Sequence, residues 1–213
     1  MIPIEKNRQT ILNLLEETER DGIHDLINWL KTTEFFVSPA STRFHLCVKG
    51  GLAQHSLNVY DTFRLLNHYY YRETLTIPSV TIPPLLHDIC KHDMYIWRGT
   101  QYGYRYVDEP PHGARSVELI KQFIELSPKE EAMIRWHMGY YHDAAEFNEV
   151  KNDLSKEHPE AHLLYFADHI ASLFVDKVDN NICPDCGIEM LLESYDKEVW
   201  QKRFRCPKCG NLI

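Results

Sequence analysis

Apolar residues recur every three or four positions in the N-terminal part of the chain, which predicts amphipathic helices. Residues 4–18 place isoleucine and leucine side chains on one side, and Pro3 stands near the start, where a helix tolerates proline. Gly22 breaks this pattern, and residues 23–30 form a second short helix of the same kind. We expect both helices to serve as packing elements.

A longer helix is predicted over residues 52–71, after a connector (residues 35–51) whose proline and serine residues indicate irregular backbone. His55, Val59 and Phe63 repeat at a spacing of four, so they share one face of this helix. His55 is therefore expected to point inward, together with the core residues.

The remaining helices are expected to be shorter, because prolines and polar stretches interrupt the apolar pattern. They are predicted at residues 85–91, 112–126, 128–137 and 159–178. Residues 77–84 contain three prolines and are expected to form a turn region rather than a helix. The polar segment 140–157 is expected to be a loop or a lid.

Residues 92–111 are dense in aromatic side chains, and the alternation from Tyr102 to Tyr106 predicts a β-hairpin. Aromatic rings beside arginines can stack a base and bind its phosphates, but a loop with its own small aromatic core explains the pattern equally well. Basic side chains also gather in the connector that precedes the long helix. The residues considered for substrate binding are His45, Lys49, Trp97, Arg98 and Tyr104.

The composition is that of an ordinary globular protein with one main domain and an appendage: 213 residues, 44% hydrophobic and 25% charged. A formal net charge of −8 argues against non-specific binding of nucleic acid by the whole surface. The sequence has no apolar run long enough to span a membrane and no signal-peptide pattern, so we expect a cytoplasmic protein.

Six cysteines divide into two isolated residues and two Cys-x-x-Cys pairs. Cys47 and Cys90 stand in apolar surroundings and are expected to be buried thiols. The two pairs flank residues 187–205 and predict a zinc ribbon with a β-hairpin between tight turns, rather than disulfides in a reducing compartment. The basic and aromatic run 202–205 could contact nucleic acid or a partner, although a structural cap is the simpler interpretation. The expected ligands of this structural zinc are Cys183, Cys186, Cys206 and Cys209.

An adjacent pair, His87 and Asp88, follows an apolar run, and an imidazole nitrogen beside a carboxylate oxygen suits a divalent transition metal. A buried histidine hydrogen-bonded to a capping aspartate would give the same pair. Further histidines and an aspartate lie in other predicted helices, and one ligand per helix is how helical bundles build a metal site. The candidate ligands are His55, His87, Asp88, His112, His137 and Asp168.

The order of these ligands, with the motifs Gly-Gly-Leu-x-x-His (50–55) and Leu-Leu-His-Asp-Ile-x-Lys (85–91), resembles the HD-domain superfamily of metal-dependent phosphohydrolases. The matching motifs run from about residue 44 to residue 173. The resemblance implies a mainly α fold, with an HD-type helical bundle over residues 1–178 and a small β zinc ribbon over residues 179–213.

The resemblance also implies one or two divalent transition metals (Mn, Fe, Co, Ni or Zn). The first ion would be held by His55, His87, Asp88 and Asp168. Asp88 would bridge to a second ion, bound also by His112 and His137. A metal-activated hydroxide would attack phosphorus, with Asp88, Lys91 and Arg115 as catalytic residues, the last two neutralising phosphoryl charge.

The implied function is hydrolysis of a nucleotide or a phosphodiester, with a small anionic phosphorylated substrate as the partner. The motifs are also similar to those of an exoribonuclease branch, but that branch usually carries an N-terminal OB-fold, for which this sequence shows no pattern. A small nucleotide is therefore the favoured substrate. Three alternatives stay open: an HD-type di-iron oxygenase that uses the same ligands, a 3'-5' exoribonuclease-like nuclease, and a non-catalytic binding module in which the ribbon is the working part.

Overall fold

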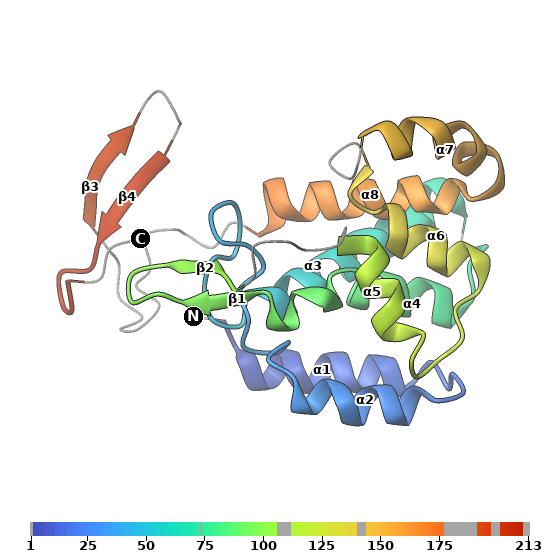
Figure 1. Cartoon of the computed structure of the whole chain (residues 1–213), viewed down its shortest axis with the longest axis horizontal. Coiled ribbons are helices and arrows are strands. Elements are labelled where there is room, and N and C mark those ends of the chain that lie inside the picture. Colours follow the sequence, from blue (N-terminus) through green and yellow to red (C-terminus); the bar gives the residue numbers. More distant parts are fainter. Residues whose placement is uncertain are drawn as a thin grey trace.

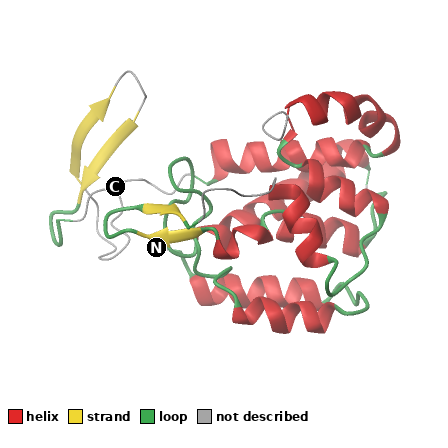
Figure 2. Cartoon of the chain, viewed as in Figure 1, coloured by secondary structure: helices red, strands yellow, loops and turns green. Residues whose placement is uncertain are grey.

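The structure of the protein, a computed structural model, describes residues 2–72, 74–105, 112–139, 144–176, 191–196 and 201–210. It is mainly helical, with two small antiparallel sheets of two strands each (Figures 1 and 2). The α-helices are α1 (Ile4–Glu16), α2 (Ile23–Thr32), α3 (Gly51–Leu66), α4 (Ile77–Leu86), α5 (His112–Ile120), α6 (Pro128–Trp136), α7 (Ala144–Glu157) and α8 (Pro159–Ile170). The shorter elements are η1 (Asn67–Tyr71), η2 (Ile89–Asp93), η4 (Ala171–Val175), β1 (Tyr95–Trp97), β2 (Tyr102–Tyr104), β3 (Leu191–Asp196) and β4 (Gln201–Arg205). None of the described helices is long and apolar enough to cross a membrane.

α1 and α2 confirm the two helices expected near the N-terminus, and they lie along one edge of the helical bundle in Figure 1. α3 confirms the longer helix and packs against α1, α4 and α8. His55, Val59 and Phe63 are buried on the same face of α3, as their spacing predicted. The helix continues directly into the π-helical turn η1.

Two glycines allow the connector to press against the first turn of α3. Gly50 has a φ of +81°, in the left-handed region that favours glycine. A Cβ atom on Gly51 would lie 2.1 Å from the carbonyl oxygen of Leu46. This close approach carries His45 to His55, with their ring centroids 4.7 Å apart.

α4 shows that the turn region expected over residues 77–84 was wrong. Thr76 caps this helix by accepting a hydrogen bond from the backbone, and Pro78 lies in the first turn, where its missing N–H is not needed. Pro83 and Pro84 lie inside the helix, and both are buried. Because α4 packs between α3 and α6, burial of its apolar residues outweighs the helix-breaking effect of the prolines.

The helix expected over residues 85–91 was also wrong, because α4 ends at Leu86 and His87 and Asp88 lie between α4 and η2. His87 Nδ1 lies 2.9 Å from the Pro84 carbonyl oxygen, the acceptor that a continued α-helix would offer to the Asp88 N–H. Adjacent residues of a regular α-helix point about 100° apart. The break after α4 therefore lets both side chains face one point.

α5 starts at His112, as expected, but ends at Ile120 instead of near residue 126. α6 confirms the expected start, since the Glu130 side chain accepts a hydrogen bond from the Ser127 N–H and Pro128 lies in the first turn.

α7 shows that a loop was the wrong expectation for residues 144–157, while residues 140–143 lie outside the described part. The alternative, a lid, stays a prediction. Phe147, Val150 and Leu154 recur at helical spacing and belong to one apolar cluster that also contains Trp136 of α6. These three apolar residues pack α7 against the bundle, although most of the segment is polar.

β1 and β2 confirm β-structure in the aromatic segment, where they form an antiparallel pair. β3 and β4 also pair antiparallel, between the two Cys-x-x-Cys pairs, and they lie apart from the helices in Figure 2. Cys183 and Cys186 lie outside the described residues, so the four-cysteine zinc ribbon stays a prediction.

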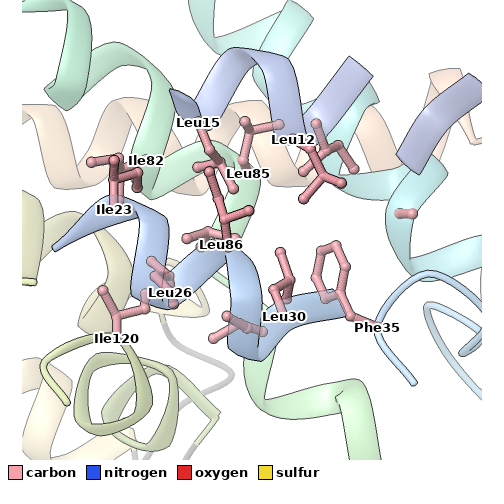
Figure 3. Packing of buried hydrophobic residues seen from close by; sticks show 14 of the residues in the cluster. Leu12, Leu15, Ile23, Leu26, Leu30, Phe35, Ile82, Leu85, Leu86 and Ile120 are labelled. Carbon is pink, nitrogen blue, oxygen red and sulfur yellow. The ribbon is translucent and has the colours of Figure 1, made fainter. Parts of the chain in front are cut away.

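The largest apolar cluster joins α1, α2, α4 and α5 (Figure 3). Leu15 of α1, Leu26 of α2 and Leu86 of α4 are fully buried in it. Truncating one such leucine to alanine typically costs about 2–5 kcal/mol. The cluster thus fixes the C-terminal end of α4 and, with it, the positions of His87 and Asp88.

Candidate metal centre

Five buried side chains from four parts of the bundle come together around Asp88. His55 belongs to α3 and Asp168 to α8, while His87 and Asp88 follow α4 and His137 follows α6. The three histidines have no exposed surface, and neither aspartate is more than 9% exposed. We call these five residues the His/Asp centre.

The distances within the His/Asp centre are those expected between ligands of a metal ion. Asp88 Oδ2 lies 3.7 Å from His55 Nε2 and 3.4 Å from His87 Nε2. Asp88 Oδ1 lies 3.5 Å from His137 Nε2, and Asp168 Oδ1 lies 3.2 Å from His55 Nε2. Two ligand atoms that are each about 2.1 Å from one ion, at a tetrahedral angle, stand roughly 3.4 Å apart.

All three histidines of the centre are oriented in the same way. Nδ1 of His87 lies 2.9 Å from the Pro84 carbonyl oxygen, and Nδ1 of His137 lies 2.7 Å from the Ile134 carbonyl oxygen. A carbonyl oxygen only accepts, so each Nδ1 carries a proton, and in the neutral form of such a ring the lone pair is on Nε2. Nδ1 of His55 is held in turn by a carboxylate, 2.7 Å from Asp176 Oδ2.

The atoms that face the middle of the centre have no hydrogen-bond partner among the residues that the structure describes. They are the Nε2 atoms of His55, His87 and His137 and the Oδ1 atom of Asp88. Leaving a buried polar atom unpaired costs about 1–3 kcal/mol. Imidazoles fixed through Nδ1, with Nε2 aimed at nearby carboxylates, are the usual arrangement of histidine metal ligands. The side chains of the His/Asp centre therefore fit a transition metal ion.

The charges of the centre also favour a cation. Burial alone would raise the pKa of Asp88, but Lys91 and His87 hold that pKa well below its usual range. Burial alone would lower the pKa of His55, but the carboxylates of Asp168 and Asp176 outweigh it and raise the pKa to about 10. The three buried carboxylates thus create a negative field at His55 Nε2, which a bound proton or metal ion neutralises.

Lys91 and Arg115, the two cations predicted to act on phosphate, have different surroundings. Lys91 is buried, and its Nζ lies 2.6 Å from Asp88 Oδ2. Arg115 donates to both carboxylate oxygens of Asp93, at 2.7 and 2.8 Å, and to the Cys90 carbonyl oxygen at 3.2 Å. Lys91 thus belongs to the surroundings of the centre, whereas Arg115 joins α5 to η2.

His112, predicted to hold a second ion, is half-buried at the start of α5. Burial and the nearby Lys91 lower the pKa of His112 to about 4, so its ring is neutral at pH 7. Among the described residues, however, His112 belongs to none of the sets whose ligand atoms all lie within 4.8 Å of one another. Its role as a ligand stays a prediction.

Of the residues considered for substrate binding, His45 lies beside the centre. Its Nε2 is buried, 3.8 Å from Asp176 Oδ2, and has no hydrogen-bond partner among the described residues. Lys49 is exposed on the connector, and Trp97, Arg98 and Tyr104 are exposed on the β1–β2 hairpin. Arg98 donates to the Tyr104 carbonyl oxygen at 2.9 Å.

Asp176 and Asn58 were not identified from the sequence, yet both lie directly behind His55. Asp176 accepts a hydrogen bond from Asn58 Nδ2 at 2.7 Å and is only 4% exposed. Asn58 follows His55 by one helical turn, but asparagine is common on helix surfaces and gave no signal. Asp176 comes after η4, whose π-helical turn no apolar spacing predicts.

The fold and the His/Asp centre together define a mainly helical protein with buried histidine and aspartate side chains that could hold a metal ion. Comparison of the chain with protein-family models, curated proteins and solved structures gives no match. Support for a function therefore comes from the motifs and from the geometry of the centre.

Proposed function

We propose that this protein is a metal-dependent phosphohydrolase of the HD type, acting on a nucleotide or a phosphodiester. The observation that carries the proposal is the common orientation of three buried histidines, each fixed through Nδ1 and each directing Nε2 toward a carboxylate of the centre. His55, His87, Asp88 and Asp168 would hold one ion. His137 faces the other oxygen of Asp88, which suits a second ion bridged by that carboxylate.

A divalent transition metal bound there would lower the pKa of a bound water and stabilise negative charge on phosphoryl oxygens. Lys91 keeps Asp88 ionised and fixed through the 2.6 Å contact between Nζ and Oδ2. Its ammonium group lies beside the centre, where it would attract the negative charge of a phosphorylated substrate. Hydrolysis adds a water oxygen to phosphorus, breaks the bond to the leaving oxygen and transfers a proton to that oxygen.

We favour a small nucleotide over a long nucleic acid as the substrate. The net charge of −8 opposes the broad phosphate contacts on which nucleic-acid binding depends. On the β1–β2 hairpin, Trp97 and Tyr104 are 45% and 51% exposed, and their rings are candidates for stacking a base.

We also propose that the C-terminal part binds a structural zinc ion through Cys183, Cys186, Cys206 and Cys209. In support, Gly210 N–H donates to the Cys206 carbonyl oxygen at 2.9 Å and Gly210 has a φ of +74°, so this pair lies on a tight turn. The turn directly follows β4, where a zinc ribbon places its second cysteine pair.

The experiment is a hydrolysis screen with metal-free protein loaded with manganese, cobalt or nickel. The substrates are ribo- and deoxynucleotides, cyclic nucleotides, a generic phosphodiester and single-stranded RNA. Asp88→Asn removes the central charge with little change in volume, and His24→Ala is the matched control, because His24 is an exposed histidine of α2. We expect turnover of one substrate class by the wild type and by His24→Ala, and none by Asp88→Asn.

If the metal-loaded wild type hydrolyses none of these substrates, the proposal of a phosphohydrolase is wrong. The same preparations would then be tested for iron-dependent oxygen consumption, the activity of the di-iron alternative.

A further inference from the structure

The carboxylate of Asp176 is held on both sides. Its Oδ2 lies 2.7 Å from His55 Nδ1, and its Oδ1 accepts a hydrogen bond from Asn58 Nδ2 at 2.7 Å. The Asp176 side chain has no exposed surface. Its backbone N–H donates to the Ala171 carbonyl oxygen at 2.8 Å, so the π-helical turn η4 also fixes its position.

A chain of side-chain hydrogen bonds orients this support from as far away as α1. Asn7 Nδ2 donates to Gln54 Oε1 at 2.9 Å, and Gln54 Nε2 donates to Asn58 Oδ1 at 2.9 Å. Because the oxygen of Asn58 is taken by Gln54, the amide presents its NH₂ group to Asp176. Each amide in this chain donates to the next residue, and the last amide, that of Asn58, donates to the Asp176 carboxylate. The other oxygen of that carboxylate accepts from His55.

His55 differs from the other two histidines of the centre in this respect. Nδ1 of His87 and Nδ1 of His137 donate to neutral backbone carbonyl oxygens, whereas Nδ1 of His55 donates to a charged carboxylate. Burying a carboxylate is costly unless a positive charge compensates it. The buried ammonium of Lys91 contacts Asp88 and not Asp176. A positive charge at His55 Nε2, either a proton or a metal ion, would compensate the carboxylate of Asp176 through the His55 ring.

We infer that Asp176, braced by Asn58, is a positioning residue that acts through His55 and makes the ion held by His55, His87, Asp88 and Asp168 the tightly bound one. A carboxylate behind an imidazole increases its basicity and fixes its ring, and losing such a partner typically costs roughly 10–100-fold in metal affinity. The ion facing His137 lacks this support and is bound more weakly. This inference rests on the proposed metal site but not on the identity of the substrate.

The test is calorimetric titration of metal-free protein with cobalt, with the visible absorption spectrum of bound cobalt as a second readout. Asp176→Asn keeps the shape of the side chain and an oxygen that can accept from His55, but it removes the charge. Glu160→Gln is the matched control, because Glu160 is another buried carboxylate, 2% exposed, that accepts from the Tyr71 hydroxyl outside the centre. Thermal unfolding checks that both variants fold.

We expect Asp176→Asn to lower the affinity for the first cobalt roughly 10–100-fold and to change the cobalt spectrum, while Glu160→Gln matches the wild type. Asn58→Ala, which frees one oxygen of Asp176, should weaken binding by a smaller factor and serves as the second variant if Asp176→Asn does not fold. If Asp176→Asn binds cobalt with the affinity and spectrum of the wild type, the inference is overturned but the proposed metal site is not. If Asp176→Asn does not fold, wild-type cobalt affinity in Asn58→Ala would overturn the inference in the same way. A wild-type protein that takes up no cobalt would overturn the proposed metal site as well.

Discussion

Glu130 is predicted to hold together the helices that deliver three of the five residues of the His/Asp centre. It has no exposed surface, and its Oε1 accepts from Arg20 at 2.7 Å and from the Ser79 hydroxyl at 2.8 Å. Its Oε2 accepts from the Ser127 N–H at 2.8 Å. Ser79 lies at the start of α4 and Ser127 at the start of α6, and His87, Asp88 and His137 follow the ends of these two helices.

Replacing Glu130 with alanine removes the acceptor of three hydrogen bonds and leaves the Arg20 guanidinium, only 21% exposed, without its carboxylate. Breaking a buried ion pair in this way costs about 3–5 kcal/mol. For a chain of this length, 1 kcal/mol corresponds to about 2–4 °C in Tm, so Glu130→Ala should lower the Tm by about 6–20 °C.

The assay is thermal and urea unfolding at neutral pH, with Glu131→Ala as the matched control. Glu131 is the next residue on α6, and it pairs with Lys121 at 2.8 Å on the surface. An exposed pair contributes about 0–1 kcal/mol. If Glu130→Ala unfolds within 1 kcal/mol of Glu131→Ala, the assigned role of the Glu130 network is wrong.

The same network predicts how the effect depends on pH. Burial alone would raise the pKa of Glu130, but the Ser127 N–H, Arg20 and Ser79 outweigh it and hold the pKa below the ordinary value of 4.5. A depressed folded-state pKa means that the stabilisation is fully present above pH 4.5 and is lost as the pH falls through the folded-state value. The stability difference between the wild type and Glu130→Ala should therefore shrink in acid, and a difference that grows there would contradict this reasoning.

Three further predictions concern the metal sites. Saturating metal, at about 100 times its Kd, should add about 2.7 kcal/mol of stability, so a chelator should lower the Tm by about 5–11 °C in scanning calorimetry; an unchanged Tm would count against a site in the fold. If His112 completes a second site, His112→Ala should reduce the metal content of the centre from two ions to one, by elemental analysis, and two retained ions would exclude His112 as a required ligand. Cys206→Ser should remove one zinc per chain and leave the metal of the His/Asp centre in place, whereas loss of both would show that the two units depend on each other.

The helices that carry His55 and Asp168 could be predicted from the sequence, because apolar residues at helical spacing set which face is buried. The region 77–84 could not, because local proline chemistry favours a turn and only the packing of α4 between α3 and α6 reverses that preference. α7 was missed for a related reason: three apolar residues in a polar segment become significant only once Trp136 is seen beside them.

The candidate ligands could be chosen from the sequence as residue types, but their arrangement could not. Backbone carbonyl oxygens orient His87 and His137 because α4 and α6 end just before these residues. A residue pattern does not predict the last residue of a helix to within one position. Asp176 and His55 are 121 positions apart in the sequence, and the π-helical turn η4 directly before Asp176 determines where its side chain lies. Arg115 was assigned to phosphate because of its place after His112, but the carboxylate of Asp93, two residues after Lys91, engages it.

The measurement that tests the central claim most directly is phosphate or nucleotide release as a function of the metal bound per chain. Metal-free wild type and Asp88→Asn would be titrated with cobalt or manganese against the substrate class found in the screen, with circular dichroism to show that both are folded. The proposal predicts that release rises in step with metal bound at the His/Asp centre and is absent from Asp88→Asn at every loading. Release that does not depend on bound metal, or that persists in folded Asp88→Asn, would contradict a metal-dependent phosphohydrolase built on this centre.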